Sequence, residues 1–350
     1  MSEFKSLTLE RKPNEQLIGL LEDNIIGTPG ESMLYRHQNI RSKVSTIPAP
    51  YYANLYIRKR LYGSICLSKR NVLTLGKKHQ AFYLRYFTFR ERFRSTNIQQ
   101  RKNDSSSLIR EDVINLMNGK GLHYHGDLVL YAYVDPENIR SKRLIDEFGF
   151  KKIGEFNTIP FSRICTKISS RVEKVVEKDL EYIYRLLKGA NKKEQLVSLD
   201  NLFTRGEYFV IRENSTIICG VQAIRDSWEI IDLPGISGRF MISVVPGIPF
   251  IGRLFKPRYE FVFLESLFCV NGKEKELGIL LESVLAFHNL NSGILCLDPK
   301  SPLYSKVKQI NLGLTHKVMG EKKIEIVVKT SDQEIFNQDL PFFVSGHDVL

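Results

Sequence analysis

The stretch VDPENIRSKRLIDEFGF, residues 134–150, decides the fold of this 350-residue chain. It follows directly on an apolar run, LVLYAYV (128–134), which is typical of a buried strand. After Pro136, apolar residues recur at helical spacing, and Gly149 can supply the left-handed residue that ends such a helix. KKIGEF (151–156) then resumes the pattern of a strand. The segment predicts strand, helix and strand in succession, the unit of an α/β protein.

The same succession is found on both sides of this stretch. AFYLRYFTF (81–89) predicts an aromatic-rich strand, and a helical pattern follows over residues 108–117. The second half begins again with a strand pattern in FVFLESLFCV (261–270), a helical stripe over 277–288 and a strand in GILCLDP (293–299). The two halves therefore carry one element order.

Two short matches support an internal duplication. Asp135-Pro136 recurs as Asp298-Pro299, and Gly149-Phe150 is matched by Gly313-Leu314 at nearly the same offset. The length also fits two domains. We therefore predict an N-terminal domain over residues 1–168 and a C-terminal domain over residues 169–350.

The positive charge is unevenly distributed. The chain has a net charge of +12, and all of this excess lies within residues 1–170. It is densest between Arg58 and Lys102, where acidic residues are almost absent. Such a field attracts polyanions, among them coenzyme A, nucleic acid and anionic membrane surfaces, although a solvated basic face without a specific ligand is the plain alternative.

Residues 134–150 resemble the strand–helix segment of the GNAT superfamily of acyl-CoA N-acyltransferases. The resemblance rests on Asn138, Ser141, Gly149 and Phe150, and it extends diffusely over most of the chain in the manner of tandem-GNAT proteins. It implies an α/β fold of two tandem GNAT-like domains. Each would be a mostly antiparallel sheet with a splayed central strand pair flanked by helices.

The resemblance also implies an acyl-CoA site at the first splayed pair. Its residues would be the strand end, the basic turn that follows it and the start of the next helix: Phe89, Arg92, Arg94, Ser95, Thr96, Asn97, Asn138 and Ser141. The turn departs from the family, because Asn97 and Gln99 occupy the positions of two glycines that let the backbone approach phosphate. Nearby arginines can supply charge-assisted hydrogen bonds instead.

Catalysis in this family needs a base for the acceptor ammonium and an acid for the departing thiolate. Ile145 occupies the position at which relatives often place a tyrosine acid. In the second half, Glu265 corresponds to a base of some relatives, and Tyr304 follows Asp298-Pro299 and could serve as the acid. An exposed strand carboxylate and a packing tyrosine are the structural alternatives.

Acetyl-CoA, or another acyl-CoA, is thus the expected substrate, an amine the expected acceptor and N-acetyltransfer the expected reaction. A non-catalytic GNAT-like scaffold and an RNA-associated aminoacyl-type transferase are the alternatives. His123 and His125 lack a third ligand with suitable spacing, so no metal is expected. Single scattered cysteines, a polar N-terminus and the absence of an apolar run of about 20 residues favour a cytoplasmic protein without a membrane span.

Overall fold

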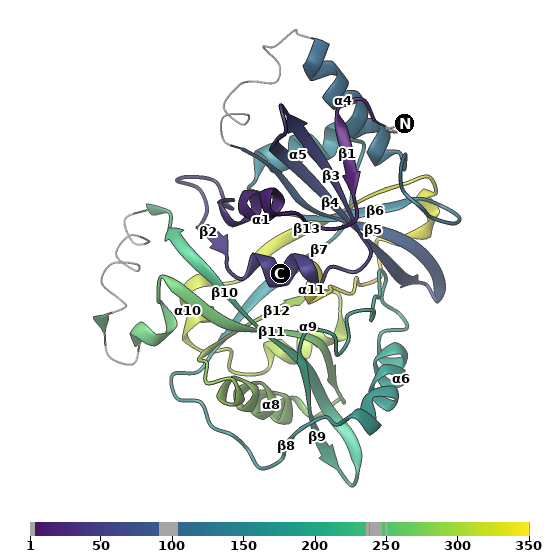
Figure 1. Ribbon diagram of the computed structural model, residues 1–350. Helices are drawn as coiled ribbons and strands as arrows, with labels where there is room; N and C mark the ends of the chain where they lie inside the picture. Colours follow the sequence, from purple (N-terminus) through teal and green to yellow (C-terminus); the bar gives the residue numbers. More distant parts are fainter. Residues whose placement is uncertain (1–3, 91–103, 236–237, 239–246, 249–250, 350) are drawn as a thin grey trace.

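A computed structural model describes residues 4–90, 104–235, 238, 247–248 and 251–349 of the chain. In these residues the backbone forms one continuous mixed sheet of 13 strands with helices packed against it (Figure 1). The strand order is β1-β3-β4-β5-β6-β13-β7-β12-β11-β10-β9-β8, and β2 pairs with β10 beside this path. All neighbouring strands are antiparallel except for two parallel pairs, β5 with β6 and β11 with β12.

Residues 1–168 supply the strands β1 (Leu7–Glu10), β2 (Leu34–His37), β3 (Pro50–Ile57), β4 (Arg60–Thr74), β5 (Lys77–Phe89), β6 (Val129–Val134) and β7 (Lys151–Ser162). Residues 169–350 supply β8 (Val172–Lys174), β9 (Glu207–Glu213), β10 (Thr216–Asp232), β11 (Arg258–Cys269), β12 (Ser292–Leu297) and β13 (Lys322–Thr330). The strands predicted at 81–89, 128–134, 151–156, 261–270 and 293–299 are therefore confirmed.

The helices are α1 (Glu15–Glu22), α2 (Ile40–Ser45), α4 (Asp104–Met117), α5 (Ile139–Glu147), α6 (Leu180–Ala190), α8 (Glu274–Phe287), α9 (Pro302–Lys308), α10 (Leu314–Met319) and α11 (Gly346–Val349). Short 3-10 turns lie at Glu177–Asp179, Ile251–Leu254 and Gln333–Ile335. The helical stripes predicted over 108–117 and 277–288 correspond to α4 and α8.

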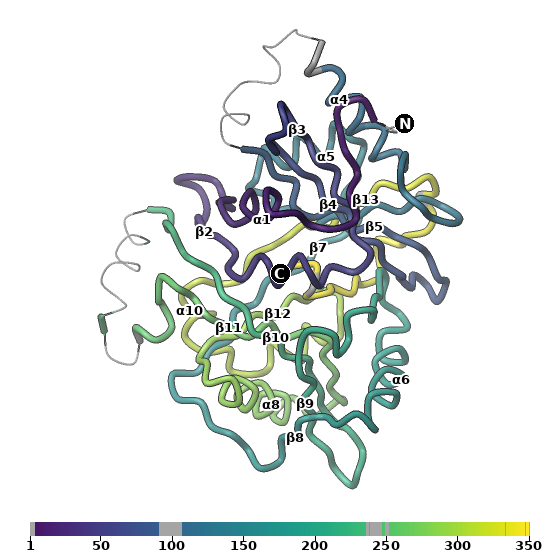
Figure 2. Tube along the Cα trace, viewed as in Figure 1, coloured from purple at the N-terminus to yellow at the C-terminus, as the bar shows by residue number. Residues whose placement is uncertain are grey.

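The two halves of the chain exchange strands in the middle of the sheet. β13, from the second half, lies between β6 and β7 of the first half and pairs antiparallel with both. β7 in turn pairs with β12 of the second half. Residues 168 and 169 lie in the connection between β7 and β8, which is not part of any strand. The sheet itself has no break between the halves. In Figure 2 the yellow tube of the C-terminal part passes among the tubes of the first half.

Each parallel strand pair is short and then separates. β5 and β6 are in register only from Ala81 with Val129 to Tyr83 with Tyr131. β11 and β12 are likewise in register over three pairs, ending at Leu264 with Leu295. Soon after the last paired residue, β5 in the first half and β11 in the second each form a bulge.

The bulge has the same backbone feature in both halves. Tyr86 in β5 has φ 51° and Ser266 in β11 has φ 50°, and the antiparallel neighbour of each strand shifts register there. A left-handed residue that is not glycine is uncommon inside a strand and bends it. The bulges explain why β5 and β11 leave their parallel partners.

The C-terminal segment lies between the halves and covers the face of the sheet opposite α4 and α8. Phe342 and Val344 are buried with Tyr83 and Tyr131 of the first half and Phe263 of the second. In Figure 1 the C-terminus is drawn at the centre of the molecule. One apolar core is therefore shared by both halves and closed by residues 342–349.

A buried ion pair fixes this segment. Arg70 of β4 donates to Asp348 of α11, and the Tyr131 hydroxyl donates to the other oxygen of Asp348 at 2.7 Å. The side chains of Arg70 and Asp348 are 1% and 0% exposed. Burial by itself lowers the pKa of Arg70, but Asp348 more than offsets this, so the pKa is raised and the guanidinium stays charged.

Arg70→Met should therefore destabilise the protein strongly, because it leaves the Asp348 carboxylate buried without its cation. We expect a loss of about 3–5 kcal/mol in the free energy of unfolding, measured by denaturant titration. Arg225→Met is the matched control, since Arg225 pairs with Glu260 at 3.2 Å on an exposed strand surface and should cost about 1 kcal/mol or less. Equal losses for the two variants would contradict this account.

Candidate functional site

The two parallel strand pairs of the sheet each separate after three paired residues, and we call these places the first and the second opening. Backbone groups of a strand that has left its neighbour have no ladder partner there and need another one. The first lies between β5, beyond Tyr83, and the end of β6 with the start of α5. The second lies between β11, beyond Leu264, and the end of β12. Of the site residues predicted from the sequence, Phe89, Asn138 and Ser141 lie at the first opening and Glu265 lies at the second. The structure differs sharply between the two openings.

Asn138 and Ser141 lie together at the first opening, at the start of α5. The Asn138 side-chain oxygen accepts a hydrogen bond from the backbone N–H of Ser141 at 3.0 Å, so Asn138 is the N-cap of the helix. Both side chains are half-buried. The spacing of three residues thus has a structural cause of its own, and the Asn138 amide nitrogen and the Ser141 hydroxyl are the groups available for a ligand.

Phe89 ends β5 at the same opening. Its ring packs on Phe87 at 5.4 Å between centroids and lies over Gly63 of β4. A Cβ at Gly63 would come within 2.1 Å of the Phe89 ring, so only glycine leaves room for this ring. The strand end is therefore positioned by tight packing. Arg92, Arg94, Ser95, Thr96 and Asn97 lie outside the described residues.

The second opening is filled by the chain itself. The backbone N–H of Phe342 donates to Asp298 at 2.9 Å, at the end of β12. The backbone N–H of Gly346 donates to Glu265 at 2.5 Å, on β11. Residues 342–346 thus bridge the two separated strands, in the place where a ligand would otherwise pair with them.

Glu265 is buried, with 7% of its surface exposed. One of its oxygens accepts from Gly346 and the other from the Gln222 amide at 2.6 Å. The strand carboxylate predicted as a base therefore faces the interior rather than solvent, and both of its oxygens already accept hydrogen bonds.

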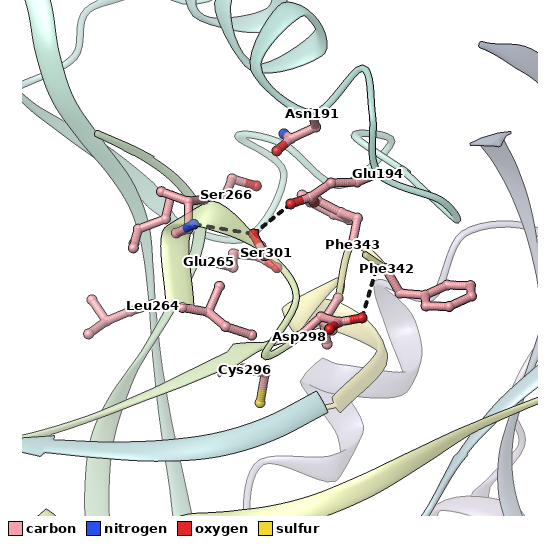
Figure 3. A pocket seen from close by; sticks show the side chains of 14 residues that line it. Asn191, Glu194, Leu264, Glu265, Ser266, Cys296, Asp298, Ser301, Phe342 and Phe343 are labelled. Atoms are coloured by element: carbon pink, nitrogen blue, oxygen red, sulfur yellow. Dashed lines mark hydrogen bonds between the residues drawn. The ribbon is translucent and has the colours of Figure 1, made fainter. Parts of the chain in front are cut away.

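A small pocket remains beside the bridging segment (Figure 3). It encloses about 20 Å³, room for about one water molecule. Its polar lining comes from Asn191, Glu194, Glu265, Ser266, Asp298 and Ser301. Three carboxyl groups thus line one enclosed space.

Glu194 is a carboxyl group of this pocket whose pKa burial raises strongly. Burial raises its pKa to about 7, and Asp298 nearby adds to the rise. The Ser301 hydroxyl donates to Glu194 at 2.7 Å, which partly opposes the shift. Sequence patterns did not single out Glu194, because the loop at 191–195 has no motif. The only sequence feature that points to a buried polar site there is that these polar residues lie between apolar neighbours.

Tyr304 of α9 does not line this pocket. Its hydroxyl donates to the Glu321 carboxylate at 2.8 Å and accepts from the side-chain amide of Asn157, on β7, at 3.3 Å. Burial and the Glu321 carboxylate raise the pKa of Tyr304 and keep it protonated. Glu321 also accepts from Lys308 at 2.6 Å. The structure therefore does not bring Tyr304 and Glu265 into one constellation.

Among the described residues, no group of three or more His, Cys, Asp or Glu side chains could hold a metal ion. His123 and His125 lie in a loop whose backbone amides donate to the Tyr51 hydroxyl and the Gln80 side chain. In the described part of the chain, no helix is both long and apolar enough to cross a membrane.

The arrangement of strands matches a known structure over nearly the whole chain. Saccharomyces cerevisiae N-myristoyltransferase with bound myristoyl-CoA superposes with a TM-score of 0.59 at 9% identity, covering 93% of this chain and 83% of that one. The chain has the GNAT fold. A second structure of the yeast enzyme with myristoyl-CoA gives a TM-score of 0.57 at 9% identity, covering 96% and 83%.

A GCN5-related N-acetyltransferase from Anabaena variabilis is a weaker match, with a TM-score of 0.48 at 9% identity over 92% of this chain and 72% of that one. No protein-family model matches the sequence, and no curated protein is significantly similar to it. At such low identity the likeness concerns the GNAT fold alone, and the sequence-based expectation of that fold is confirmed.

Glu194 should make the stability of the protein depend on pH. Its pKa in the folded state is raised, so the stability that its protonated form allows is complete below about pH 4.5 and is lost as the pH rises through about 7. Between these two pH values the wild type should lose about 3 kcal/mol of unfolding free energy, and Glu194→Gln should not show this loss. The measurement is the difference in unfolding free energy between wild type and variant as a function of pH.

Glu181→Gln is the control, because Glu181 is an exposed residue that pairs with Arg185 on α6. Parallel pH profiles for wild type and Glu194→Gln would contradict the assignment.

Proposed function

We propose that this protein is an acyl-CoA-dependent N-acyltransferase. The observation that supports this most directly is the opening between β5 and β6, where the strands separate after three paired residues and a left-handed Tyr86 bends β5 away. A strand that has left its neighbour can offer its backbone groups to the amides of a pantetheine arm. The match to an enzyme structure that holds myristoyl-CoA supports the same ligand class.

We place the acyl-CoA in the first opening rather than the second. In the second opening, Phe342 and Gly346 occupy the hydrogen-bonding positions beside Asp298 and Glu265. A ligand there would have to displace a buried segment. The positive charge of the first half also favours an anionic ligand.

Phe89, Asn138 and Ser141 are the described residues that we propose to contact the ligand. Phe89 would border the arm where β5 ends, and Asn138 and Ser141 would reach it from the start of α5. For the phosphates we propose the basic turn that follows β5, with Arg92, Arg94, Ser95, Thr96 and Asn97.

The proposed reaction is a direct transfer. The acceptor amine attacks the thioester carbonyl carbon, the C–S bond breaks and the CoA thiolate takes up a proton while the nitrogen loses one. Acetyl is the acyl group that we propose first, and myristoyl is the alternative suggested by the ligand of the matched structures.

Glu265 is our proposed base and Tyr304 our proposed acid, and because the structure does not bring these two side chains together, each role is a separate proposal. For Glu265 this role requires that Gly346 moves off the carboxylate in the reactive complex, because both oxygens accept hydrogen bonds in this structure. Tyr304 holds a proton at neutral pH, as an acid requires, and its raised pKa makes it a weaker donor than a free tyrosine.

Acyl-CoA binding is tested by calorimetry with acetyl-CoA and myristoyl-CoA and by turnover on a panel of amines. Asn138→Ser is the informative variant, because serine caps a helix as well as asparagine does but lacks the amide donor. We expect a several-fold weaker affinity with unchanged thermal stability. Binding without turnover on any amine would favour a non-catalytic GNAT-like protein, and no heat with either thioester would remove the proposal.

Glu265→Gln and Tyr304→Phe test the two catalytic assignments. Each should lower kcat by about 100-fold or more while KM changes little. Glu260→Gln on the same strand and Tyr184→Phe on α6 are the controls, because both side chains are partly or largely exposed to solvent. Unfolding curves of all four variants show whether a lower kcat results from loss of the folded state. An unchanged kcat in either variant would exclude that residue.

A further inference from the structure

The hairpin between β3 and β4 has an unusual turn. Ile57 pairs with Arg60, and the two residues between them, Arg58 and Lys59, have φ values of 48° and 67°. Two consecutive left-handed residues form the type I′ turn, for which Asn-Gly is strongly preferred. Arg-Lys is therefore a poor choice for the backbone, which suggests that the side chains are retained for another purpose.

The other half of the chain forms the same turn without charge. The hairpin between β9 and β10 stands before β11 as the β3–β4 hairpin stands before β5. Its turn residues are Asn214 and Ser215, with φ 49° and 66°. The fold can thus close this hairpin with small polar residues, and the cations belong to the first half alone.

The turn lies at the end of the sheet where β5 ends. Gly63 of β4 pairs with Phe89, and the backbone N–H of Arg90 donates to the carbonyl of Tyr62 at 2.9 Å. Since β6 is parallel to β5, the start of α5 with Asn138 is at this end too. The cations therefore lie at the same end of the sheet as the first opening, the end at which we propose that the phosphates of acyl-CoA bind.

The turn is held in place by α1. The Gln16 side chain donates to the Lys59 carbonyl at 3.2 Å and accepts from the Leu61 backbone N–H at 2.8 Å. Arg90 adds its own charge, with its Nε donating to the Leu61 carbonyl at 2.9 Å. A fixed turn presents its charges with little loss of backbone entropy on binding.

The three cations at the turn have no counter-ion among the described residues. Arg58, Lys59 and Arg60 are exposed, and no carboxylate in the described ranges forms an ion pair with them. The nearby Glu15 is paired with Arg41 at 2.7 Å. An anionic ligand would thus meet unneutralised charge.

We infer that Arg58, Lys59 and Arg60 bind a phosphate of the adenosine diphosphate part of acyl-CoA, and so select CoA thioesters over donors that carry only a pantetheine arm. This inference rests on the proposed function. The side chains act on binding and selection and take no part in the acyl transfer itself.

The test is calorimetric titration of the variant Arg58→Asn with Lys59→Gly. It removes two charges and installs the residue pair that a type I′ turn prefers, so the hairpin is kept. The probes are CoA, dephospho-CoA, which lacks the 3′-phosphate, and pantetheine. We expect CoA to bind about tenfold or more weakly to the variant, with a weaker dependence on salt, while pantetheine binds as to wild type.

The probes identify the phosphate. If the 3′-phosphate is bound, wild type prefers CoA over dephospho-CoA and the variant loses the preference. If the diphosphate is bound, the variant weakens both equally. Lys77→Gln with Lys78→Gln is the control, since these two exposed lysines follow the type I′ turn of the β4–β5 hairpin at the opposite end of the strands.

CoA affinity within twofold of wild type in the turn variant, or an equal loss in the control, would overturn the inference and leave the proposed function intact. Reduced tRNA binding with unchanged CoA binding would assign the turn to nucleic acid and also overturn it. Failure of wild type to bind CoA at all would remove the proposed function together with the inference.

Discussion

The exchange of strands between the halves is the constraint on which the rest of this structure depends. β13 pairs with β6 and β7, and β7 pairs with β12, so the central strands come alternately from the two halves. The halves therefore cannot move as independent bodies without breaking ladder hydrogen bonds. Both halves contribute to one apolar core, and the C-terminal segment packs into it against strands of both halves.

That shared core makes the two halves chemically unequal. The bulges at Tyr86 and Ser266 separate the strands in the same way, but at the second opening the backbone of residues 342–346 donates hydrogen bonds to both separated strands. The segment is held by its own backbone N–H groups, which donate to the carboxylates of Glu265 and Asp298. The buried ion pair of Asp348 with Arg70 holds it as well. The repeated architecture thus anchors the chain at one opening, and the other is the one in which we propose that the ligand binds.

Much of the element order could be predicted from the sequence, because it depends on local patterns. Residues 128–156 form β6, the Asn138-capped α5 and the start of β7, as their pattern predicts. The pairing of β13 with β6 could not be predicted, since any apolar strand offers the same backbone groups to many partners. The domain division at 168/169 stays a prediction, because the sheet crosses it.

The site was predictable only in part, for a related reason. Asn138 and Ser141 are neighbours in sequence, so their proximity follows from helix geometry. Glu265 and Tyr304 were assigned from the order of elements, which does not determine what a side chain faces. The structure places Tyr304 against Glu321 and Glu265 against Gly346, and both contacts join residues distant from the predicted motif.

The position of β13 also has a consequence for how the chain folds. β6 receives its antiparallel partner from residues 322–330, about two hundred residues later in the sequence. Contacts this distant are slow to form, because the entropy of closing a long loop is lost before they contribute. During synthesis, at roughly 5–20 residues per second, β6 and β7 therefore exist for many seconds as unpaired edges that invite association with other chains. Cells that make this protein must keep its first half from aggregating until the second half has arrived.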